Sequence, residues 1–281
     1  MTNRELNPLN RNMITYIWKD LPSDLDKCYI IPLADTHVGE PLFDERKFRG
    51  YLKWIADTPE AYCIFNGDLC NCGLPNSVGS DWWGQRPLTP HEQTEEVVSI
   101  VKEYNIKDKI IGIVGGSNHP SRARKLTGHD YDLQFAEAMG LKHLYAMNGL
   151  GVMVRLGSLE WSKGRKLNNG GKVKYIIYTT HGWAGGRHAG SSINAARELG
   201  AFILADIYIV SHRHLDSVTK DEYYTFDHRR PVVNSHKRMF ITSGSFLKWG
   251  GYAQTKGLRP TGTGTPRIRL DGRVKDVHAS V

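Results

Sequence analysis

The chain has 281 residues, 40% of them hydrophobic and 23% charged, which is enough apolar material for a sizeable core and excludes global disorder. We find no apolar run long enough to cross a bilayer, and residues 1–27 have no signal-peptide core, so we expect a cytoplasmic protein with no membrane partner. The net charge of +8 favours phosphate-bearing partners, nucleic acid included, although the basic residues are spread along the chain.

The elements expected in chain order are those of an α/β protein. Residues 1–27 are expected to be an irregular lead-in or a short helix, and residues 28–281 a single domain. Apolar, often β-branched runs predict buried strands at 28–34, 62–66, 109–114, 172–180 and 206–210. Periodicity and end signals predict helices at 44–56, 90–104, 131–139 and 191–199. A strand at 150–156 should pair antiparallel with 172–180, and two later strands, about 239–243 and 267–270, should complete a second sheet.

Four cysteines do not suggest a disulfide framework. Cys28 and Cys63 lie in apolar runs, so we expect them in the core. The pair Cys70 and Cys72 is closer together than the usual zinc-binding spacing, and no second pair exists, so a thiolate zinc site is not expected. The surrounding loop, residues 70–88, carries two adjacent tryptophans, Trp82 and Trp83, and a loop of this length is usually functional or mobile.

Acidic, amide and imidazole side chains follow the predicted strands, where active sites form in parallel-rich α/β sheets. Residues two apart on an extended chain point the same way, so each Asp-x-His or His-x-His pair can reach one ion. The candidate metal ligands are Asp35, His37, Asp68, Asn118, His181, His212 and His214. Seven ligands suit two ions that share a carboxylate, an arrangement that stabilises both the attacking and the leaving oxygen of an in-line displacement. Mixed oxygen and imidazole ligands suit manganese, which we prefer, with iron and zinc as alternatives.

The ordered series D-T-H, N-G-D, S-N-H, T-H-G and S-H-R-H resembles the calcineurin-like metallophosphoesterases, whose pattern is D-x-H, G-D, G-N-H-D/E, H and G-H-x-H. The resemblance covers residues 28–215, and the 70–88 loop and the 246–252 stretch look like bacterial and phage-encoded branches. It implies a four-layer α/β/β/α sandwich. It also implies one metal held by Asp35, His37, Asp68 and His214, and another held by Asp68, Asn118, His181 and His212. His119 matches the histidine that contacts phosphate and protonates the leaving oxygen.

Three positions depart from the family pattern. Pro120 stands where the family has an acidic residue, which would orient His119 and raise its basicity. Another group must therefore orient His119, or proton donation is slower. Ser117 and Ser211 replace glycines; both are small, so we expect the turns to survive.

The resulting expectation is a two-metal phosphoesterase that acts on a phosphomonoester or phosphodiester. The alternative is a nuclease or DNA-repair-type phosphodiesterase, which the positive charge, the paired tryptophans and the basic residues after His119 favour. A metal-binding scaffold without catalysis is a third reading, supported only by Pro120. Arg122, Arg187 and Arg213 could bind phosphate oxygens or be ordinary salt-bridge partners. No G-x-S-x-G element is present, which argues against a serine hydrolase.

Overall fold

The computed structural model describes residues 14–74, 88–158, 161–162, 165–166, 171–183 and 189–281. Two six-stranded sheets dominate these residues. Sheet A has the order β1-β6-β9-β10-β12-β11, with β1 (Thr15–Asp20), β6 (Leu150–Leu156), β9 (Val173–Thr180), β10 (Ile207–Val210), β11 (Ser217–Phe226) and β12 (Val233–Thr242). Sheet B has the order β14-β13-β2-β3-β4-β5, with β2 (Lys27–Leu33), β3 (Ala61–Asn66), β4 (Ile110–Val114), β5 (Tyr145–Ala146), β13 (Arg267–Asp271) and β14 (Val277–Ser280). A short separate ribbon pairs β7 (Trp161–Ser162) with β8 (Arg165–Lys166).

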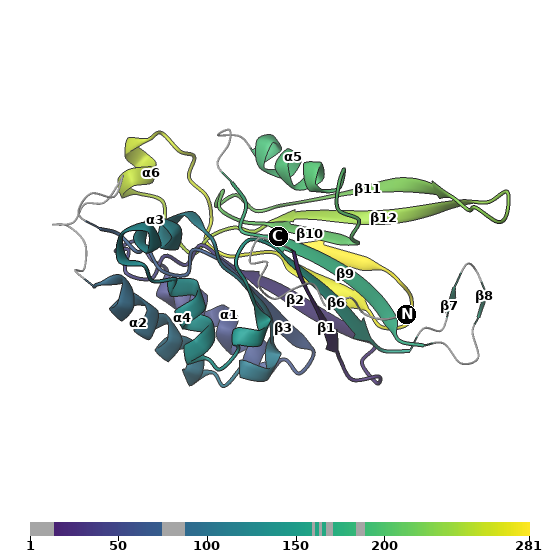
Figure 1. Ribbon diagram of the computed structural model, residues 1–281, viewed down its shortest axis with the longest axis horizontal. Coiled ribbons are helices and arrows are strands. Elements are labelled where there is room, and N and C mark those ends of the chain that lie inside the picture. The colour runs from purple at the N-terminus through teal and green to yellow at the C-terminus, as the bar shows by residue number, and fades with distance from the viewer. Residues whose placement is uncertain (1–13, 75–87, 159–160, 163–164, 167–170, 184–188) are drawn as a thin grey trace.

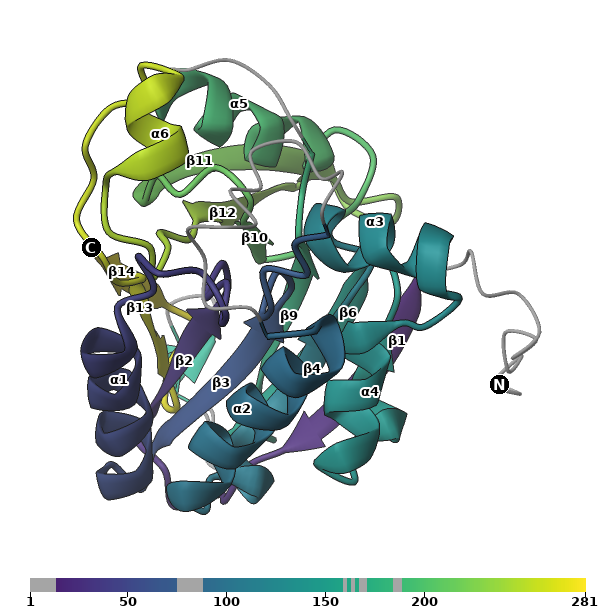
Figure 2. The ribbon, with the colours of Figure 1, turned by 90° about the vertical axis from the view of Figure 1, so that its left-hand side faces the viewer.

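Helices cover the outer faces of both sheets (Figure 1). The helices are α1 (Glu45–Asp57), α2 (Pro90–Glu103), α3 (Asn118–Thr127), α4 (Tyr131–Ala138), α5 (Ala189–Leu199) and the short α6 (Gly251–Thr255), with 3-10 turns η1 (Lys107–Lys109) and η2 (Lys142–Leu144). Figure 2 shows α1, α2 and α4 over sheet B, with α5 lying beyond sheet A.

Three hydrophobic clusters correspond to the three interfaces between these layers. One lies between sheet B and helices α1, α2 and α4, and includes Phe48 and Phe135. A second lies between the two sheets, with Ile64 and Val152 among its fully buried members. A third joins sheet A to α5 around Phe240. The order of layers is therefore α/β/β/α, which confirms the predicted fold class.

The carboxyl ends of the parallel strands lie at one end of the sandwich. In sheet B, β2 pairs parallel with β3 up to Leu33, and β3 pairs parallel with β4 up to Asn66. In sheet A, β9, β10 and β12 are parallel, and Val210 is level with both Thr180 and Thr242. The segments that follow these strands consequently leave the two sheets side by side.

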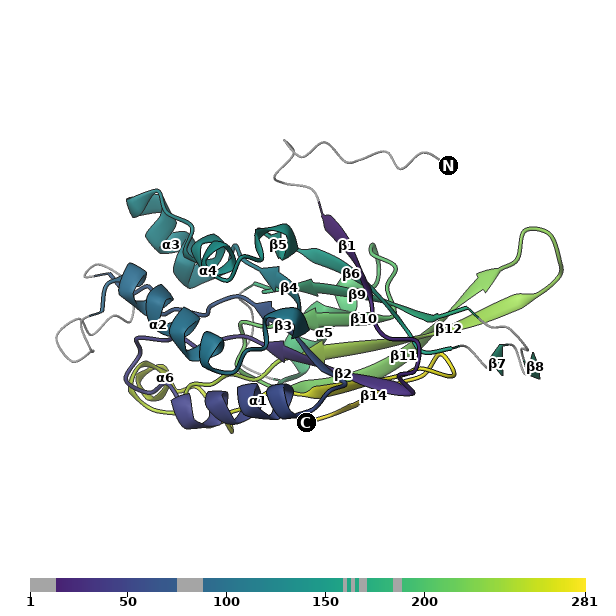
Figure 3. The ribbon, with the colours of Figure 1, turned by 90° about the horizontal axis from the view of Figure 1, so that it is seen from below.

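Several sequence-based expectations about elements were wrong. Residues 15–20 are not irregular or helical but form β1, which pairs parallel with β6. The strands at 239–242 and 267–271 do not share a sheet, because β12 pairs with β10 in sheet A and β13 pairs with β2 in sheet B. Helix α3 and most of the long hairpin of β11 and β12 were not predicted; the hairpin extends beyond the other strands of the two six-stranded sheets (Figure 3).

The helices and the cysteines bear on two further expectations. Within the part of the chain that the structure describes, no helix has the length and apolar character needed to cross a membrane. Cys28 and Cys63 are fully buried core residues, as predicted. Cys70 and Cys72 are also buried, and all four cysteines are free thiols.

Candidate metal centre and active site

Most of the predicted ligand residues lie in loops, and five of the seven have a backbone conformation that side chains usually avoid, whereas Asn118 is the first residue of α3. Asp35, His37, Asp68, His212 and His214 all have positive φ angles, of 51°, 48°, 48°, 74° and 54°. The expectation that each pair sits on an extended segment was therefore wrong. Left-handed backbone costs a non-glycine residue roughly 1–2 kcal/mol, and such strain tends to be retained where function needs it.

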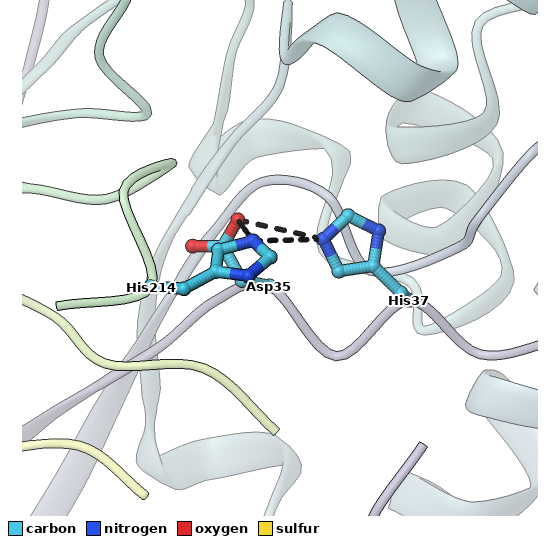
Figure 4. A group of neighbouring side chains, drawn as sticks. All are labelled: Asp35, His37 and His214. Carbon is cyan, nitrogen blue, oxygen red and sulfur yellow. Dashed lines mark hydrogen bonds and ion pairs between the residues drawn. The ribbon is translucent and has the colours of Figure 1, made fainter. Parts of the chain in front are cut away.

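One group of side chains gathers Asp35, His37 and His214 (Figure 4). The Nε2 atoms of the two histidines are 3.2 Å apart. Asp35 Oδ1 lies 3.2 Å from Nε2 of His214 and 3.6 Å from Nε2 of His37. Ligand atoms about 2.1 Å from a common ion are about 3.0–3.4 Å apart at octahedral or tetrahedral angles. The spacing of these three atoms is thus close to that of one coordination shell.

A second group gathers Asp68, His181 and His212. Asp68 Oδ2 lies 3.1 Å from Nε2 of His181, and Nδ2 of Asn118 lies 3.1 Å from Nε2 of His212. Turning the Asn118 amide by 180° would present its oxygen at the same place. His181 Nε2 is also 3.9 Å from Asp35 Oδ1, which links this group to the first.

Asp68 lies between these two groups. It belongs to the second group, and its carboxylate also forms a third potential ligand group with His37 and His119. The structure therefore brings the seven predicted ligands together in one connected cluster, in which Asp68 contacts residues of both groups.

Strong charge interactions act within this buried cluster. Burial raises the pKa of Asp35, but the neighbouring His214 and His181 outweigh it and hold that pKa well below its usual range. Burial likewise opposes ionisation of Asp68, whose pKa His181 and His119 nevertheless lower. Burial lowers the pKa of His181, yet Asp68 and Asp35 raise it to about 10. Attraction between the carboxylates and the neighbouring imidazoles therefore outweighs the cost of burying their charges.

Four buried polar atoms of the cluster make no hydrogen bond of good geometry among the described residues: Asp35 Oδ1, His37 Nδ1, His181 Nε2 and His212 Nδ1. For Asp35 Oδ1 and His181 Nε2, the near neighbours are the ion-pair atoms of His214 and Asp68. Buried polar groups in folded proteins are nearly always satisfied, so such a concentration requires a reason. A cation between the two carboxylates and the imidazoles would satisfy Asp35 Oδ1 and His181 Nε2 without a proton on the histidine. The residues present therefore fit a site for divalent metal.

His119 lies beside this cluster at the start of α3. Its backbone N–H donates to Asp68 Oδ1 at 3.1 Å, and its ring meets the ring of His37 edge-on at a centroid distance of 4.5 Å. Its Nδ1 is 2.8 Å from the backbone carbonyl of Asn71. Burial lowers the pKa of His119 to about 4, although Asp68 acts in the opposite direction. His119 is therefore neutral at pH 7 in the free protein.

A buried hydrogen-bond network around Asn66, which was not predicted from the sequence, lies next to the cluster and supports it. Asn66, at the end of β3, donates to the Thr180 carbonyl at 2.9 Å and to Ser211 Oγ at 2.6 Å, and accepts from Thr179 Oγ1 at 2.7 Å. Its carbonyl faces Nδ1 of His181 at 2.8 Å. The network joins the ends of the two sheets and fixes the ring of a candidate ligand. The only sequence signal was a polar asparagine at the end of an apolar strand.

The serine at the altered glycine position has a structural role. Ser117 Oγ accepts a hydrogen bond from the backbone N–H of Asp68 at 2.9 Å and donates to Asp132 Oδ2 at 3.1 Å. Asp132 is fully buried in α4, and burial together with Asp68 and Asp130 raises its pKa to about 8. The serine therefore anchors the turn that carries Asp68. At the second altered glycine, Ser211 takes part in the Asn66 network.

The remaining predicted residues have different outcomes. Arg122 lies on α3, close enough to His119 to lower its pKa. Arg213 donates from Nε to the Trp183 carbonyl at 3.3 Å. Arg187, Trp82 and Trp83 lie outside the described residues. Phosphate binding by any of the three arginines remains a prediction.

Comparisons with known proteins find similarity only to solved structures. No protein-family model matches the chain, and no curated protein matches it. Among solved structures, the chain is similar to a conserved uncharacterized protein from Streptococcus pneumoniae TIGR4, described as a predicted phosphoesterase, with 13% identity and a TM-score of 0.34 over 91% of this chain and 99% of the other. It is also similar to a metallophosphoesterase from Sphaerobacter thermophilus, with 13% identity and a TM-score of 0.34 over 86% of this chain and 83% of the other.

Proposed function

We propose that the protein is a metal-dependent phosphoesterase that hydrolyses a phosphomonoester or a phosphodiester. The observation that carries the proposal is the convergence of carboxylate and imidazole groups from five separate segments into one cluster, whose two carboxylates are fully buried. The cluster contains carboxylate and imidazole atoms that make no hydrogen bond of good geometry among the described residues. A cluster of ionised and unsatisfied groups is costly to bury without a compensating cation.

Two divalent ions are the cofactors that best suit this ligand set, with manganese preferred. One would be held by Asp35, His37, Asp68 and His214, and the other by Asp68, Asn118, His181 and His212. When bound, such ions make a coordinated water more acidic and offset the negative charge of the reacting phosphoryl group.

Within the chain, the carboxylates have a positioning role as well as a charge. Asp35 accepts the backbone N–H of His212 through Oδ2 at 2.9 Å, which fixes the loop that carries two ligands. Asp68 accepts the backbone N–H of His119 through Oδ1, which holds His119 next to the candidate ligands.

His119 is the residue that we assign to protonate the leaving oxygen. A carbonyl can only accept, so the Asn71 carbonyl keeps a proton on Nδ1 and leaves Nε2 available to exchange one. Burial lowers the pKa of His119 to about 4 in the free protein. A bound phosphoester brings negative charge next to the ring, which favours the protonated form. Donation of this proton would then be coupled to substrate binding.

The proposal is tested with p-nitrophenyl phosphate and bis(p-nitrophenyl) phosphate in the presence of Mn²⁺. Chelator should abolish turnover, and Asp68→Asn should reduce it on the order of 100-fold or more because it removes the shared carboxylate. Asp108→Asn, an exposed carboxylate in η1, is the matched control and should retain full activity. Labelled DNA and RNA in parallel assays would separate nucleic acid from small esters. Full activity of Asp68→Asn, or turnover that resists chelation, would overturn the proposal.

A further inference from the structure

The ring of His119 is oriented by a backbone carbonyl, and not by an acidic side chain from the next residue. The next residue is Pro120, which is buried in the first turn of α3 and carries no carboxylate. The ring nitrogen that such a carboxylate would hold is instead 2.8 Å from the carbonyl of Asn71, which comes from the segment after β3. A chain segment distant in sequence therefore orients the ring.

Asn71 is itself fixed through its backbone and its side chain. Its backbone N–H donates to the Val38 carbonyl at 3.0 Å. Its side-chain Nδ2 donates to Oε2 of Glu40 at 3.1 Å. The next residue, Cys72, donates its N–H to Oε1 of the buried Gln93 at 2.8 Å. These bonds hold the Asn71 carbonyl in position from the segment around Glu40 and from α2.

Glu40 is built into a tight turn next to the candidate ligands. Its N–H donates to the His37 carbonyl at 2.9 Å, and the turn passes through Gly39 at a φ of 98°. A Cβ on Gly39 would lie 2.5 Å from the side chain of Gln93, so this turn packs directly against α2. Glu40 is partly buried, and its carboxylate accepts a hydrogen bond from the side-chain amide of Asn71. Asn71 is the residue whose backbone carbonyl contacts His119.

We propose that Glu40 and Asn71 act together as positioning residues for His119, and take the place of the acidic neighbour that Pro120 removes. Glu40 anchors the Asn71 side chain, and the anchored backbone carbonyl keeps the proton of His119 on Nδ1 and aims Nε2 at the leaving oxygen. This inference rests on the proposed function for the role of His119 as proton donor. The hydrogen bonds that link Glu40, Asn71 and His119 do not depend on that function.

The first test compares leaving groups. An ester of p-nitrophenol leaves with little need of a proton, whereas an ester of an aliphatic alcohol needs one, so loss of His119 alignment should slow the second substrate selectively. Glu40→Ala and Asn71→Ala should each lower the ratio of aliphatic to nitrophenyl turnover about tenfold. The double variant should be no worse than either single variant. Glu40→Gln keeps an acceptor oxygen for Asn71 and should restore most of the ratio, which a merely structural defect would not do.

The matched control is Glu198→Ala, an exposed carboxylate on α5, which should leave the ratio unchanged. Metal content should be equal in all variants, because Glu40 and Asn71 are not among the assigned ligands. A ratio in Glu40→Ala and Asn71→Ala equal to that of the control would overturn the inference.

The second test does not need turnover. Nitrogen-15 NMR of histidine-labelled protein reports which ring nitrogen of His119 carries the proton. The parent protein should show the Nδ1–H form, and Glu40→Ala should show a mixture of the two forms. If the protein hydrolysed no phosphoester at all, the proposed function would fail, and this spectrum would still decide the inference. An unchanged Nδ1–H signal in Glu40→Ala and Asn71→Ala would refute it.

Discussion

The unusual backbone of the candidate metal loops predicts a reversal of the normal preference between alanine and glycine. His212 has a φ of 74°, and its side chain comes from the loop after β10. Replacing it by alanine or by glycine removes the same imidazole, so the two variants differ only in a Cβ. Left-handed backbone costs alanine roughly 1–2 kcal/mol, while glycine loses roughly 0.5–1 kcal/mol more backbone entropy on folding. We therefore expect His212→Gly to be more stable than His212→Ala by about 0.5–1 kcal/mol.

The assay is urea unfolding in chelator, where no metal affinity enters the comparison. The control is the same pair of substitutions at Leu126, which is 65% exposed in α3. In a helix, alanine should be favoured over glycine by about 1 kcal/mol, so the sign should be opposite at the two sites. Added Mn²⁺ should stabilise the parent protein but neither His212 variant to the same extent. An alanine variant at position 212 that equals or exceeds the glycine variant in stability would refute the claim that strain is stored there.

Three further predictions concern the groups that support the site. The pKa of Asp132 is raised to about 8, so the folded state keeps a proton that the unfolded state releases near pH 4. The parent protein should therefore lose stability as the pH rises, and Asp132→Asn should gain relative to it by up to about 1.4 kcal/mol per pH unit between pH 5 and 7 in urea titrations. A difference in stability that does not change with pH would contradict this prediction. Gly67→Ala should destabilise the fold by about 2–4 kcal/mol, measured in the same way, since φ is 85° and a Cβ would lie 2.7 Å from Nδ1 of His181. Thr89→Ala should cost about 1 kcal/mol in the same assay, because Thr89 caps α2 and accepts from the N–H of Glu92; no measurable loss would show that the capping box does not stabilise α2.

The residues of the candidate site could be predicted because side chains able to bind metal stand directly after predicted strands. Five apolar runs that became buried strands, β2, β3, β4, β9 and β10, were followed by a carboxylate, amide or imidazole, as with β2 and Asp35 or β10 and His212. Strand ends in a parallel sheet lie together, so the sequence indicated which side chains converge without indicating their exact geometry. The helix start at Thr89 was equally readable, because its capping signal is local.

The elements that were missed are those whose stability depends on distant partners. The short β1 alternates between half-buried and exposed residues, with Trp18 57% exposed, and it is a strand only because β6 offers its edge. The β11–β12 hairpin carries polar residues on both faces over most of its length, so the only part of it that a buried run marks is the end of β12, which was predicted as a short strand. The orienting carbonyl of Asn71 has no sequence signature, since every residue has a carbonyl and only the folded loop brings this one to His119.

The location of the cluster links its assembly to the packing of the two sheets. Asp35, Asp68 and Asn118 follow strands of sheet B, whereas His181, His212 and His214 follow strands of sheet A. The apolar interface between the sheets therefore brings the carboxylates and most of the imidazoles together, and the Asn66 hydrogen bonds close the seam at the end where they meet. Neither half offers a complete ligand shell, so an ion bound across the seam favours the packed state over any state in which the sheets separate. Metal binding at this site should consequently act as a clamp on the sandwich itself, and its affinity should depend on residues such as Asn66 that touch no ion.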